Sequence, residues 1–402
     1  MRTVAISFTN FGPYHIARLR ALAKALEPSG SRLIAYETAA TEAMYPWQTQ
    51  HDRESFDWVT LFPDRVLEQI SGKECIQAMG RALHRDHPDL LGVVGYVRPE
   101  SLAMLRWARG HGIPTVLMSE SQAIDRPRVW WKEAVKRRRV RHFSAGLVGG
   151  PRHRDYLVSL GMSKERIALG YNAVDAEAFA SAAENYRRET GGRLGLPEKP
   201  YFLAVSRFAK EKNIVRLVEA YTRYRREIGA LSAWDLVLCG DGPEAAAIEN
   251  AVVSSGFASS IHRPGFLQQS ALSRWYAFAS AFVHPSLMEP WGLVVNEAAA
   301  CGLPLLVSDR AGCVETFVPE APGDVFTGRR LDGRDAGLMA TSLRWVSMLP
   351  EVERSAMGEA AAKIARAWGP ERFAQGALEA FQIALGVERQ SAPGRREFAS
   401  VH

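Results

Sequence analysis

The sequence is poor in cysteine and has no long hydrophobic run. Four cysteines, at positions 75, 239, 301 and 313, occur among 402 residues, and none forms a CxxC pair. No histidine pair has the spacing of zinc ligands. The longest apolar stretches, such as residues 90–97, are strand-sized, and the first residues lack the features of a signal peptide. These absences predict a cytoplasmic protein with reduced thiols and no structural zinc.

The composition is that of a folded protein with two domains. Hydrophobic residues make up 47% and charged residues 23% of the chain, which excludes a largely disordered, collagen-like or coiled-coil protein. A length of 402 residues exceeds what one hydrophobic core usually holds, so we expect two domains. The formal net charge of +6 favours anionic partners, which include phosphates, nucleic acids and acidic lipids.

Strand-like and helix-like segments alternate along the chain, which predicts an α/β fold with parallel sheets covered on both faces. The alternation starts with a strand at residues 2–8, passes a linker with a short helix at residues 174–198, and restarts at residues 201–206. We expect an N-terminal domain at 1–175, a C-terminal domain at 176–370, a helix at 371–386 that packs back on the first domain, and a disordered tail at 387–402. Such sheets bind ligands at the carboxyl ends of their strands, so the site should lie in a cleft between the domains.

One informative segment runs from residue 284 to residue 304. A buried strand ends at His284, and a helix begins near Gly292. The free amides and partial positive charge of a helix N-terminus suit a phosphate. Glu289 precedes this helix and Glu297 lies on it, and we interpret the two carboxylates as acceptors for hydroxyl groups of a sugar and a ribose. The alternative is that Glu289 is a charge at a helix start and Glu297 belongs to a solvated helix face.

A second informative segment, residues 206–213, ends a strand and opens a helix. Its Arg207 and Lys212 can reach the same cleft, and their charges suit a diphosphate. When a sugar leaves a nucleotide diphosphate, charge builds on the phosphates, so fixed cations would stabilise the transition state. The alternative is that both are ordinary surface charges at the start of a helix.

Taken together, these segments resemble a known family. The patterns Ser-Arg-Phe-x-x-Glu-Lys-Asn, Cys-Gly-Asp-Gly-Pro, Pro-Gly-Phe-Leu, Pro-Ser-x-x-Glu-Pro-Trp-Gly-Leu and Asn-Glu-Ala-x-Ala-x-Gly-Leu-Pro follow one another between residues 201 and 320. They resemble the donor domain of the family 4 (group 1) retaining glycosyltransferases, which have the GT-B fold. The resemblance implies two Rossmann-like domains whose parallel sheets face a central cleft, the N-terminal one for the acceptor and the C-terminal one for a nucleotide-sugar donor.

The resemblance also implies a role for each matching residue. Arg207 and Lys212 would bind the donor diphosphate and Glu289 would hold hydroxyls of the donor sugar, so these three would be the catalytic residues. The donor-binding positions would be the amides around Trp291, Gly292 and Leu293, then Glu297 at the ribose, Phe266 and Leu267 near the base, and Gly12 at the diphosphate. The family needs no metal ion and no other cofactor, and the sequence has no Asp-x-Asp pair.

On the acceptor side, the sequence departs from the pattern of the family. Relatives often place several glycines after the first strand, whereas only Gly12 stands here. Many relatives carry a functional histidine after the strand equivalent to residues 115–119, where this chain continues with Glu120. We expect Glu120 to take that place and His15 to face the cleft, with a structural role for His15 as the alternative.

Residues 126–142 combine two tryptophans with a dense basic cluster. Trp130 and Trp131 precede six basic residues, which are Lys132, Lys136, Arg137, Arg138, Arg139 and Arg141. Such a segment suits an anionic membrane face and would explain a lipid-linked acceptor. The alternative is a solvated helix with one tryptophan packed inside. No motif that reads nucleic acid accompanies the cluster, so we expect no nucleic-acid partner.

The sequence thus predicts a retaining glycosyltransferase that moves a sugar from a nucleotide-diphosphate-sugar to a glycan or lipid-linked acceptor. The reaction would belong to exopolysaccharide, capsule or lipopolysaccharide synthesis, and the enzyme would be cytoplasmic and peripheral on the inner face of the plasma membrane. Two alternatives stay open. One is a GT-B nucleotide-sugar epimerase or phosphorylase, and the other is a non-catalytic, membrane-docking member of the fold.

Overall fold

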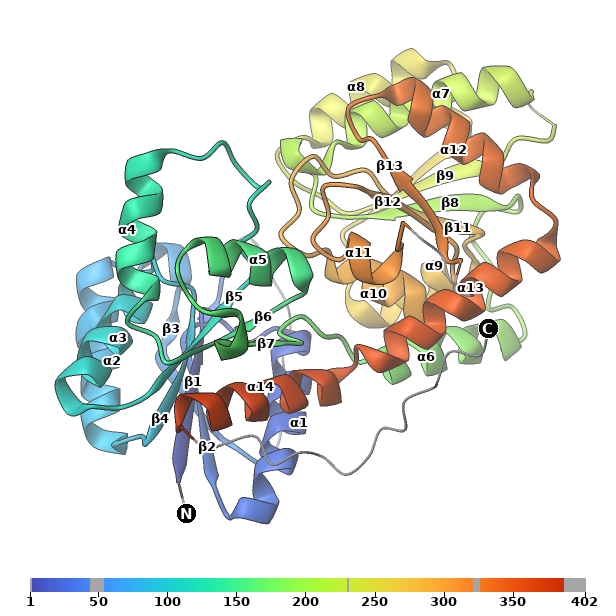
Figure 1. Cartoon of the computed structure of the whole chain (residues 1–402). Coiled ribbons are helices and arrows are strands. Elements are labelled where there is room, and N and C mark those ends of the chain that lie inside the picture. Colours follow the sequence, from blue (N-terminus) through green and yellow to red (C-terminus); the bar gives the residue numbers. More distant parts are fainter. Residues whose placement is uncertain (1, 44–53, 230, 321–325, 387–402) are drawn as a thin grey trace, which may run out of the picture.

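The protein is built from two parallel sheets, each covered by helices on both faces (Figure 1). The structure is a computed structural model that describes residues 2–43, 54–229, 231–320 and 326–386. The first sheet has the strand order β3-β2-β1-β4-β5-β6-β7, and the second has the order β10-β9-β8-β11-β12-β13. This arrangement confirms the predicted α/β fold with two Rossmann-like domains.

The elements of the first domain alternate between strand and helix. In chain order they are β1 (Thr3–Phe8), α1 (Pro13–Leu26), β2 (Arg32–Thr41), β3 (Asp57–Val66), α2 (Gly72–Asp86), β4 (Leu90–Val94), α3 (Pro99–His111), β5 (Thr115–Ser119), α4 (Trp130–Val140), β6 (Ala145–Val148), α5 (Pro151–Ser159) and β7 (Ile167–Leu169).

The second domain repeats this alternation. Its elements are α6 (Ala176–Arg188), β8 (Tyr201–Val205), α7 (Ile214–Ile228), β9 (Asp235–Cys239), α8 (Ala245–Ser255), β10 (Ile261–Gly265), α9 (Gln269–Phe278), β11 (Ala281–His284), α10 (Leu293–Ala300), β12 (Leu305–Ser308), α11 (Val314–Phe317), β13 (Gly328–Leu331), α12 (Ala336–Met348) and α13 (Glu351–Ala367). The last helix, α14 (Pro370–Ala384), returns to the first domain.

Each sheet is buried on both faces, which explains why its central strands read as continuous apolar runs. In β1, Ile6 packs with α1 and α14 on one face, whereas Ala5 packs with α2 and α3 on the other. In β8, Leu203 packs into the core on one face of the second sheet and Phe202 into the core on the other. Successive side chains of a strand point to opposite faces, so a strand covered by helices on both sides needs apolar residues at every position.

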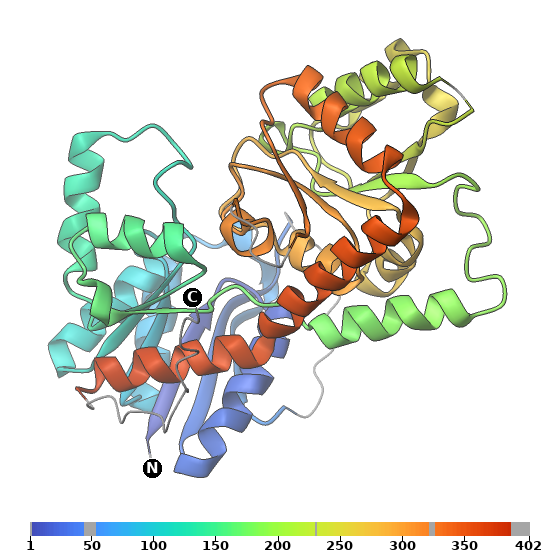
Figure 2. The same ribbon diagram turned by 45° about the vertical axis from the view of Figure 1, so that its right-hand side comes forward.

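The chain crosses between the domains at two places that pack against each other. The turn after β7 leads into the second domain, and the break between α13 and α14 leads back to the first (Figure 2). Gly170 lies where they meet: it has a φ of 120°, and a Cβ there would stand 2.6 Å from the carbonyl oxygen of Arg372. The Tyr171 and Phe373 rings follow, with centroids 6.3 Å apart. This close approach requires a glycine.

Several elements differ from the sequence expectations. The strands β3, β7, β10 and β13 are not predicted, because they are short or carry proline and charged residues. Pro63 and Asp64 interrupt the apolar pattern of β3, which lies at a sheet edge where proline is tolerated. The short helix expected in the linker is the 13-residue α6, and its Phe179 packs into the second core. The tail predicted at residues 387–402 lies outside the described residues.

Candidate active site

Two cavities lie between the domains, at the carboxyl ends of the strands. The first, called the Glu297 cavity, has about 490 Å³ and is lined by Glu297, Arg207, Phe266, Leu267 and Val294 of the second domain and by Tyr14 of the first. The second, called the Glu120 cavity, has about 320 Å³ and is lined by Glu120, His15 and Asp125 of the first domain and by Pro290 of the second. Pro290 belongs to the loop between β11 and α10, and Val294 and Glu297 belong to α10 itself, so the two cavities adjoin this loop and the helix that follows it.

Lys212 and Glu289 form a buried ion pair at this loop. Lys212 Nζ lies 2.5 Å from Glu289 Oε2, and the two side chains are 15% and 9% exposed. His284 Nε2 lies 2.9 Å from the same carboxylate oxygen, and Ser286 Oγ lies 3.3 Å from it. Burial by itself would raise the pKa of Glu289, but the charge of Lys212 and the hydrogen bonds from His284 and Lys212 outweigh it and lower the pKa to about 2. Glu289 is therefore ionised at neutral pH.

The local fold places Lys212 by a left-handed turn. Lys212 ends a short 3-10 turn, and the next residue, Asn213, has a φ of 63°. The Asn213 amide donates to the carbonyls of Pro285 at 3.1 Å and Gly333 at 2.6 Å, which ties this turn to the loop after β11. Asparagine tolerates this backbone conformation better than most residues, so one residue both turns the chain and anchors it.

Gly292 makes room for Glu289 at the start of α10. It has a φ of 102°, and a Cβ there would lie 3.3 Å from Glu289 Cγ and 3.4 Å from His284 Nε2. The helix begins at Leu293, directly after Gly292, so its first turn with the free amides starts beside Glu289. The Trp291 ring is buried and donates from Nε1 to Asn296 Oδ1 at 2.9 Å. Only the backbone of Trp291 is therefore available to a ligand.

Glu297 is fully buried, so its interpretation as part of a solvated helix face is wrong. Its two carboxylate oxygens accept hydrogen bonds from Tyr14 Oη at 2.5 Å and Tyr276 Oη at 2.8 Å. Burial raises the pKa of Glu297, and the two tyrosine hydrogen bonds oppose that shift only in part. Tyr14 belongs to α1, so the first domain reaches this acid across the cleft.

Arg207 also lines the Glu297 cavity. Its Nη2 pairs with Glu211 Oε1 at 3.0 Å, and its Nε is buried without a hydrogen-bond partner among the described residues. Gly240 lines the same cavity, and a Cβ there would lie 1.8 Å from the carbonyl oxygen of Ser206. Phe266 is 41% exposed and lines the cavity together with Leu267. The structure thus brings Arg207, the acids Glu297 and Asp241, and apolar side chains to one cavity.

The Glu120 cavity holds two titratable groups predicted for the acceptor side. The Gly12 amide donates to His15 Nδ1 at 3.2 Å, so the imidazole carries its proton on Nε2 and the Gly12 amide is occupied. Burial, with a smaller effect of Arg18, lowers the pKa of His15 to about 3. Glu120 accepts from Asn172 Nδ2 at 2.6 Å, and burial raises its pKa against the opposing charge of Arg18. His15 is therefore neutral at ordinary pH.

Sequence reasoning missed the partners that hold these residues. His284 stands at a strand end, so its position gave a signal, whereas the contact of Tyr14 with Glu297 joins residues 283 positions apart. Tyr276 lies inside a helix, and Gln122 and His153 act across the domain boundary, so the sequence offers no local pattern for them. Among residues 2–43, 54–229, 231–320 and 326–386, no group of three or more His, Cys, Asp and Glu side chains is placed to hold a metal ion.

Cations, a helix N-terminus and two acids lie at the cleft between two Rossmann-like domains, and this combination suits a ligand with phosphate and hydroxyl groups. Comparison with known proteins agrees. Residues 187–364 match the family model of the group 1 glycosyl transferases. A D-inositol 3-phosphate glycosyltransferase of Paenarthrobacter aurescens is 26% identical over 328 residues, which cover 80% of this chain and 77% of that protein. A sulfoquinovosyl transferase of Arabidopsis thaliana is 30% identical over 167 residues, or 42% of this chain and 30% of that protein.

Solved structures share the fold over nearly the whole chain. A sucrose-phosphate synthase from Thermosynechococcus elongatus has a TM-score of 0.74 and 18% identity, covering 96% of this chain and all (100%) of its own. HepE of Anabaena, in complex with UDP and glucose, has a TM-score of 0.69 and 16% identity, covering 95% of this chain and 100% of its own. The family match supports a group 1 glycosyltransferase, and the solved structures support the GT-B fold. They do not favour an epimerase or a non-catalytic protein.

Proposed function

We propose that the protein is a retaining, metal-independent glycosyltransferase that transfers a sugar to a hydroxyl of a glycan or lipid-linked acceptor, in exopolysaccharide, capsule or lipopolysaccharide synthesis. The observation that carries the proposal is the buried Lys212–Glu289 pair beside the N-terminus of α10. A cation and helix amides suit a diphosphate, and an ionised acid suits sugar hydroxyls. Val294 and Glu297 of the same helix line the cavity that Arg207 also lines.

The donor would lie across the two acids. Arg207, Lys212 and the α10 amides would bind the diphosphate, Glu289 the sugar and Glu297 the ribose. Phe266 and Leu267 form the apolar wall that a base requires. This orientation directs the anomeric carbon toward Pro290, which lines the Glu120 cavity from the second domain.

The reaction would be a substitution on one face of the sugar. The acceptor hydroxyl oxygen forms a bond to the anomeric carbon on the side from which the diphosphate leaves, while the bond from that carbon to the phosphate oxygen breaks. The acceptor proton passes to the leaving phosphate oxygen, so the anomeric configuration is kept. Negative charge grows on the diphosphate, and Lys212 with Arg207 stabilises it. These two cations supply the charge that a metal ion supplies in other transferases.

The acceptor would enter the Glu120 cavity, which offers acids and hydroxyls. Glu120 and Asp125 line it together with Thr9, Ser119 and Tyr171. The neutral His15 can donate one hydrogen bond from Nε2 but does not titrate near pH 7, because its pKa is about 3. We therefore assign His15 and Glu120 to binding of acceptor hydroxyls and leave the proton transfer to the phosphate.

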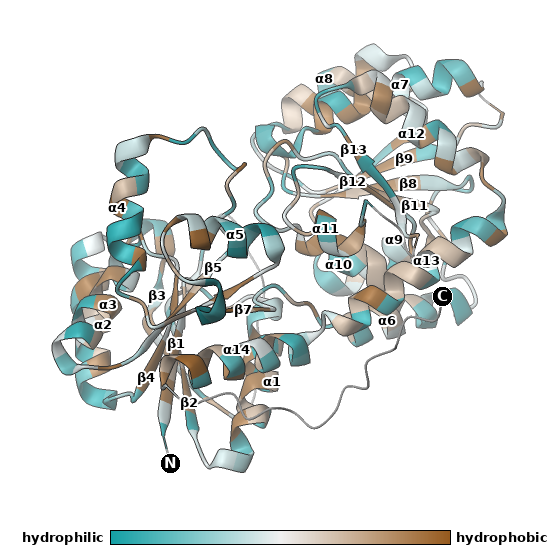
Figure 3. Ribbon diagram, in the orientation of Figure 1, coloured by the Kyte–Doolittle hydropathy of each residue, from teal (hydrophilic) through white to brown (hydrophobic). Residues whose placement is uncertain are grey.

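Helix α4 is the element proposed to meet an anionic membrane. Trp130 is 82% and Trp131 52% exposed, so the expectation that one of them packs inside is wrong. Trp131, Val135 and Arg138 recur at helical spacing and are all exposed, and Figure 3 shows the largely polar α4 at the edge of the first domain. An exposed apolar and basic stripe suits acidic lipid headgroups. No helix in the described part of the chain is long and apolar enough to cross a bilayer.

A donor screen tests the enzymatic proposal. Purified protein is incubated with UDP-, GDP- and ADP-sugars and cell-envelope extract, and nucleotide release is measured with and without EDTA. We expect turnover with at least one donor, unaffected by EDTA, and a product whose anomeric coupling constant matches that of the donor. Lys212→Met should abolish turnover, whereas the exposed neighbour substitution Lys210→Met should not. Absence of release with every donor would refute the proposal.

Sedimentation with vesicles tests the membrane proposal separately. We expect binding to vesicles of phosphatidylglycerol and phosphatidylcholine but not to phosphatidylcholine alone, with loss of binding at high salt. Arg138→Glu and the double substitution of Trp130 and Trp131 by Ala should reduce binding. Arg226→Glu, an exposed charge reversal on α7, is the matched control. Equal binding of all variants would exclude α4 as the contact.

A further inference from the structure

Two side chains of the first domain hold consecutive carbonyl groups of the loop that carries Glu289. Gln122 Nε2 donates to the carbonyl of Glu289 at 2.9 Å and to that of Arg310 at 3.1 Å. His153 Nε2 lies 2.7 Å from the carbonyl oxygen of Pro290. The two side chains are 0% and 1% exposed, so neither contact is shared with solvent. We call Gln122 and His153 the clasp.

The donor atoms of the clasp are fixed by their surroundings. The Gly150 amide donates to His153 Nδ1 at 3.1 Å, so the proton must be on Nε2, which then donates to Pro290. Burial lowers the pKa of His153 and keeps the ring neutral. For Gln122, the two facing carbonyl oxygens identify the nitrogen end of the amide. The side chain of each clasp residue therefore donates hydrogen bonds to backbone carbonyls of the second domain.

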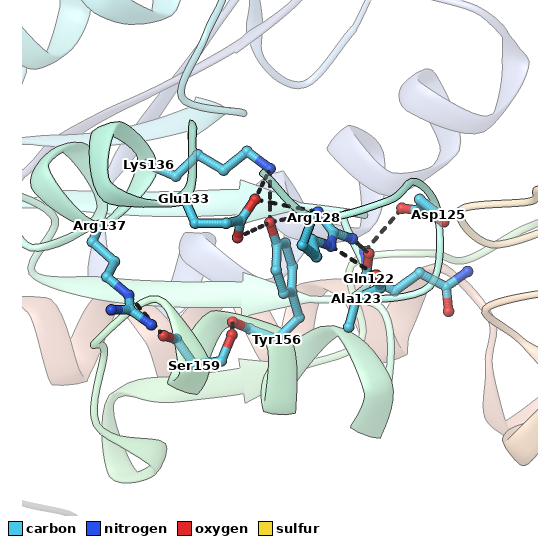
Figure 4. A network of polar contacts seen from close by, with 9 residues as sticks. All are labelled: Gln122, Ala123, Asp125, Arg128, Glu133, Lys136, Arg137, Tyr156 and Ser159. Atoms are coloured by element: carbon cyan, nitrogen blue, oxygen red, sulfur yellow. Dashed lines mark hydrogen bonds and ion pairs between the residues drawn. The ribbon is translucent and has the colours of Figure 1, made fainter. Parts of the chain in front are cut away.

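The first domain also holds the backbone of Gln122 (Figure 4). The Gln122 amide donates to Asp125 Oδ2 at 3.0 Å, and the Arg128 guanidinium donates to the carbonyls of Gln122 and Ala123. Arg128 in turn lies over the Tyr156 ring, 4.3 Å from its centroid. These contacts lie within the first domain, so they can hold Gln122 in position whether or not the second domain is in contact.

We propose that Gln122 and His153 are positioning residues that fix the Glu289–Pro290 backbone when the domains close. The proposal rests on the proposed function, because it assigns a purpose to the position of Glu289. Gly292 lies next to the Glu289 side chain and Lys212 pairs with it, so a shift of this backbone displaces the carboxylate and the start of α10 together. Within the second domain, the Gly312 amide donates to the Glu289 carbonyl at 3.0 Å, and this bond would remain when the domains open.

The alternative is that the clasp only packs the domains together. Matched substitutions distinguish this packing role from the positioning role. Gln122→Met keeps the length of the side chain and removes both hydrogen bonds. We expect kcat for nucleotide release to fall about 100-fold with a donor KM changed less than about threefold, because a small displacement of a catalytic group is costly. The kcat of His153→Leu should fall by a similar factor. His153→Gln retains a hydrogen-bond donor, so its kcat should lie between those of His153→Leu and the wild type. Gln382→Met, on the exposed side of α14, is the control.

Amide hydrogen exchange gives a readout that needs no turnover. Residues 286–293 should exchange faster in Gln122→Met and His153→Leu than in the wild type and in Gln382→Met, at equal melting temperature. If either Gln122→Met or His153→Leu fails to fold, the remaining variant and His153→Gln still test the positioning role. Folded variants with wild-type kcat and unchanged exchange would overturn the clasp. A wild type without turnover on any donor would instead refute the proposed function, and the exchange result would still stand.

Discussion

Replacement of Lys212 by Met should destabilise the protein in a way that depends on pH. The substitution leaves Glu289 buried, 7% exposed, with hydrogen bonds from His284 and Ser286 but without its charged partner. Removal of one member of a buried ion pair costs about 3 kcal/mol of the free energy of unfolding. For a domain of this size, that loss lowers the melting temperature by roughly 6–12 °C.

The pH dependence follows from the pKa of Glu289. In the wild type this pKa is about 2, below the ordinary value of 4.5, so the carboxylate stabilises the fold above pH 4.5 and this contribution is lost as the pH falls toward 2. Without Lys212, burial dominates and raises the pKa of Glu289 in the folded state. The variant should then lose stability as the pH rises, so its deficit relative to wild type is largest at neutral pH and shrinks on acidification.

The assay is thermal unfolding of wild type, Lys212→Met and the double variant Lys212→Met with Glu289→Gln between pH 4 and pH 8. We expect the double variant to recover most of the lost stability, because no buried charge is left unpaired, but to remain inactive. Lys210→Met should melt like the wild type. The reasoning is refuted if the deficit of Lys212→Met stays constant over this pH range, or if the double variant is no more stable than the single one.

Three further predictions concern the walls of the two cavities. Tyr14→Phe removes a hydrogen bond to the buried Glu297 and should cost about 2 kcal/mol of stability, measured by urea unfolding. Gly240→Ala places a Cβ 1.8 Å from the Ser206 carbonyl oxygen at a φ of 143°, so UDP binding measured by calorimetry should be lost or the domain should unfold. Because the pKa of His15 is lowered from 6.5 to about 3, its stabilising contribution is complete above pH 6.5 and is lost as the pH falls. His15→Gln should therefore leave the shape of the pH–rate profile above pH 5.5 unchanged.

Each of these predictions has an outcome that contradicts it. Gly80→Ala, on α2 with open space around its Cβ, controls for the loss of a glycine, and equal UDP binding by Gly240→Ala would show that the backbone there can shift. Unchanged stability of Tyr14→Phe would show that water replaces the hydroxyl. If the pH–rate profile of the wild type has a limb near pH 6.5 and this limb is absent from His15→Gln, the His15 imidazole titrates during turnover.

The positions of Arg207, Lys212, Glu289 and Glu297 at the cleft could be predicted from the sequence, because these residues lie on two short segments. Arg207 with Lys212, and Glu289 with Glu297, stand within eight residues of each other, and the strand-to-helix turn alone brings each pair to one edge of the sheet. The contacts across the cleft could not be predicted. Tyr14 reaches Glu297 over 283 positions and Gln122 reaches Glu289 over 167, and both depend on how two domains dock rather than on any local pattern.

The opposite pKa shifts of the two glutamates explain how one anion site can contain two acids. Glu289 faces an ammonium, which lowers its pKa to about 2, whereas Glu297 faces two neutral hydroxyls, and burial raises its pKa. In the proposed reaction, the arriving diphosphate draws Lys212 toward itself, and the Glu289 carboxylate, still ionised, is released to accept hydroxyls of the sugar. Glu297 has no cation to lose, and its oxygens keep free lone pairs for a ribose beside their tyrosine partners. The ion pair therefore keeps the site close to neutral before the donor binds, and repulsion between the acids and the diphosphate is reduced at both positions for different physical reasons.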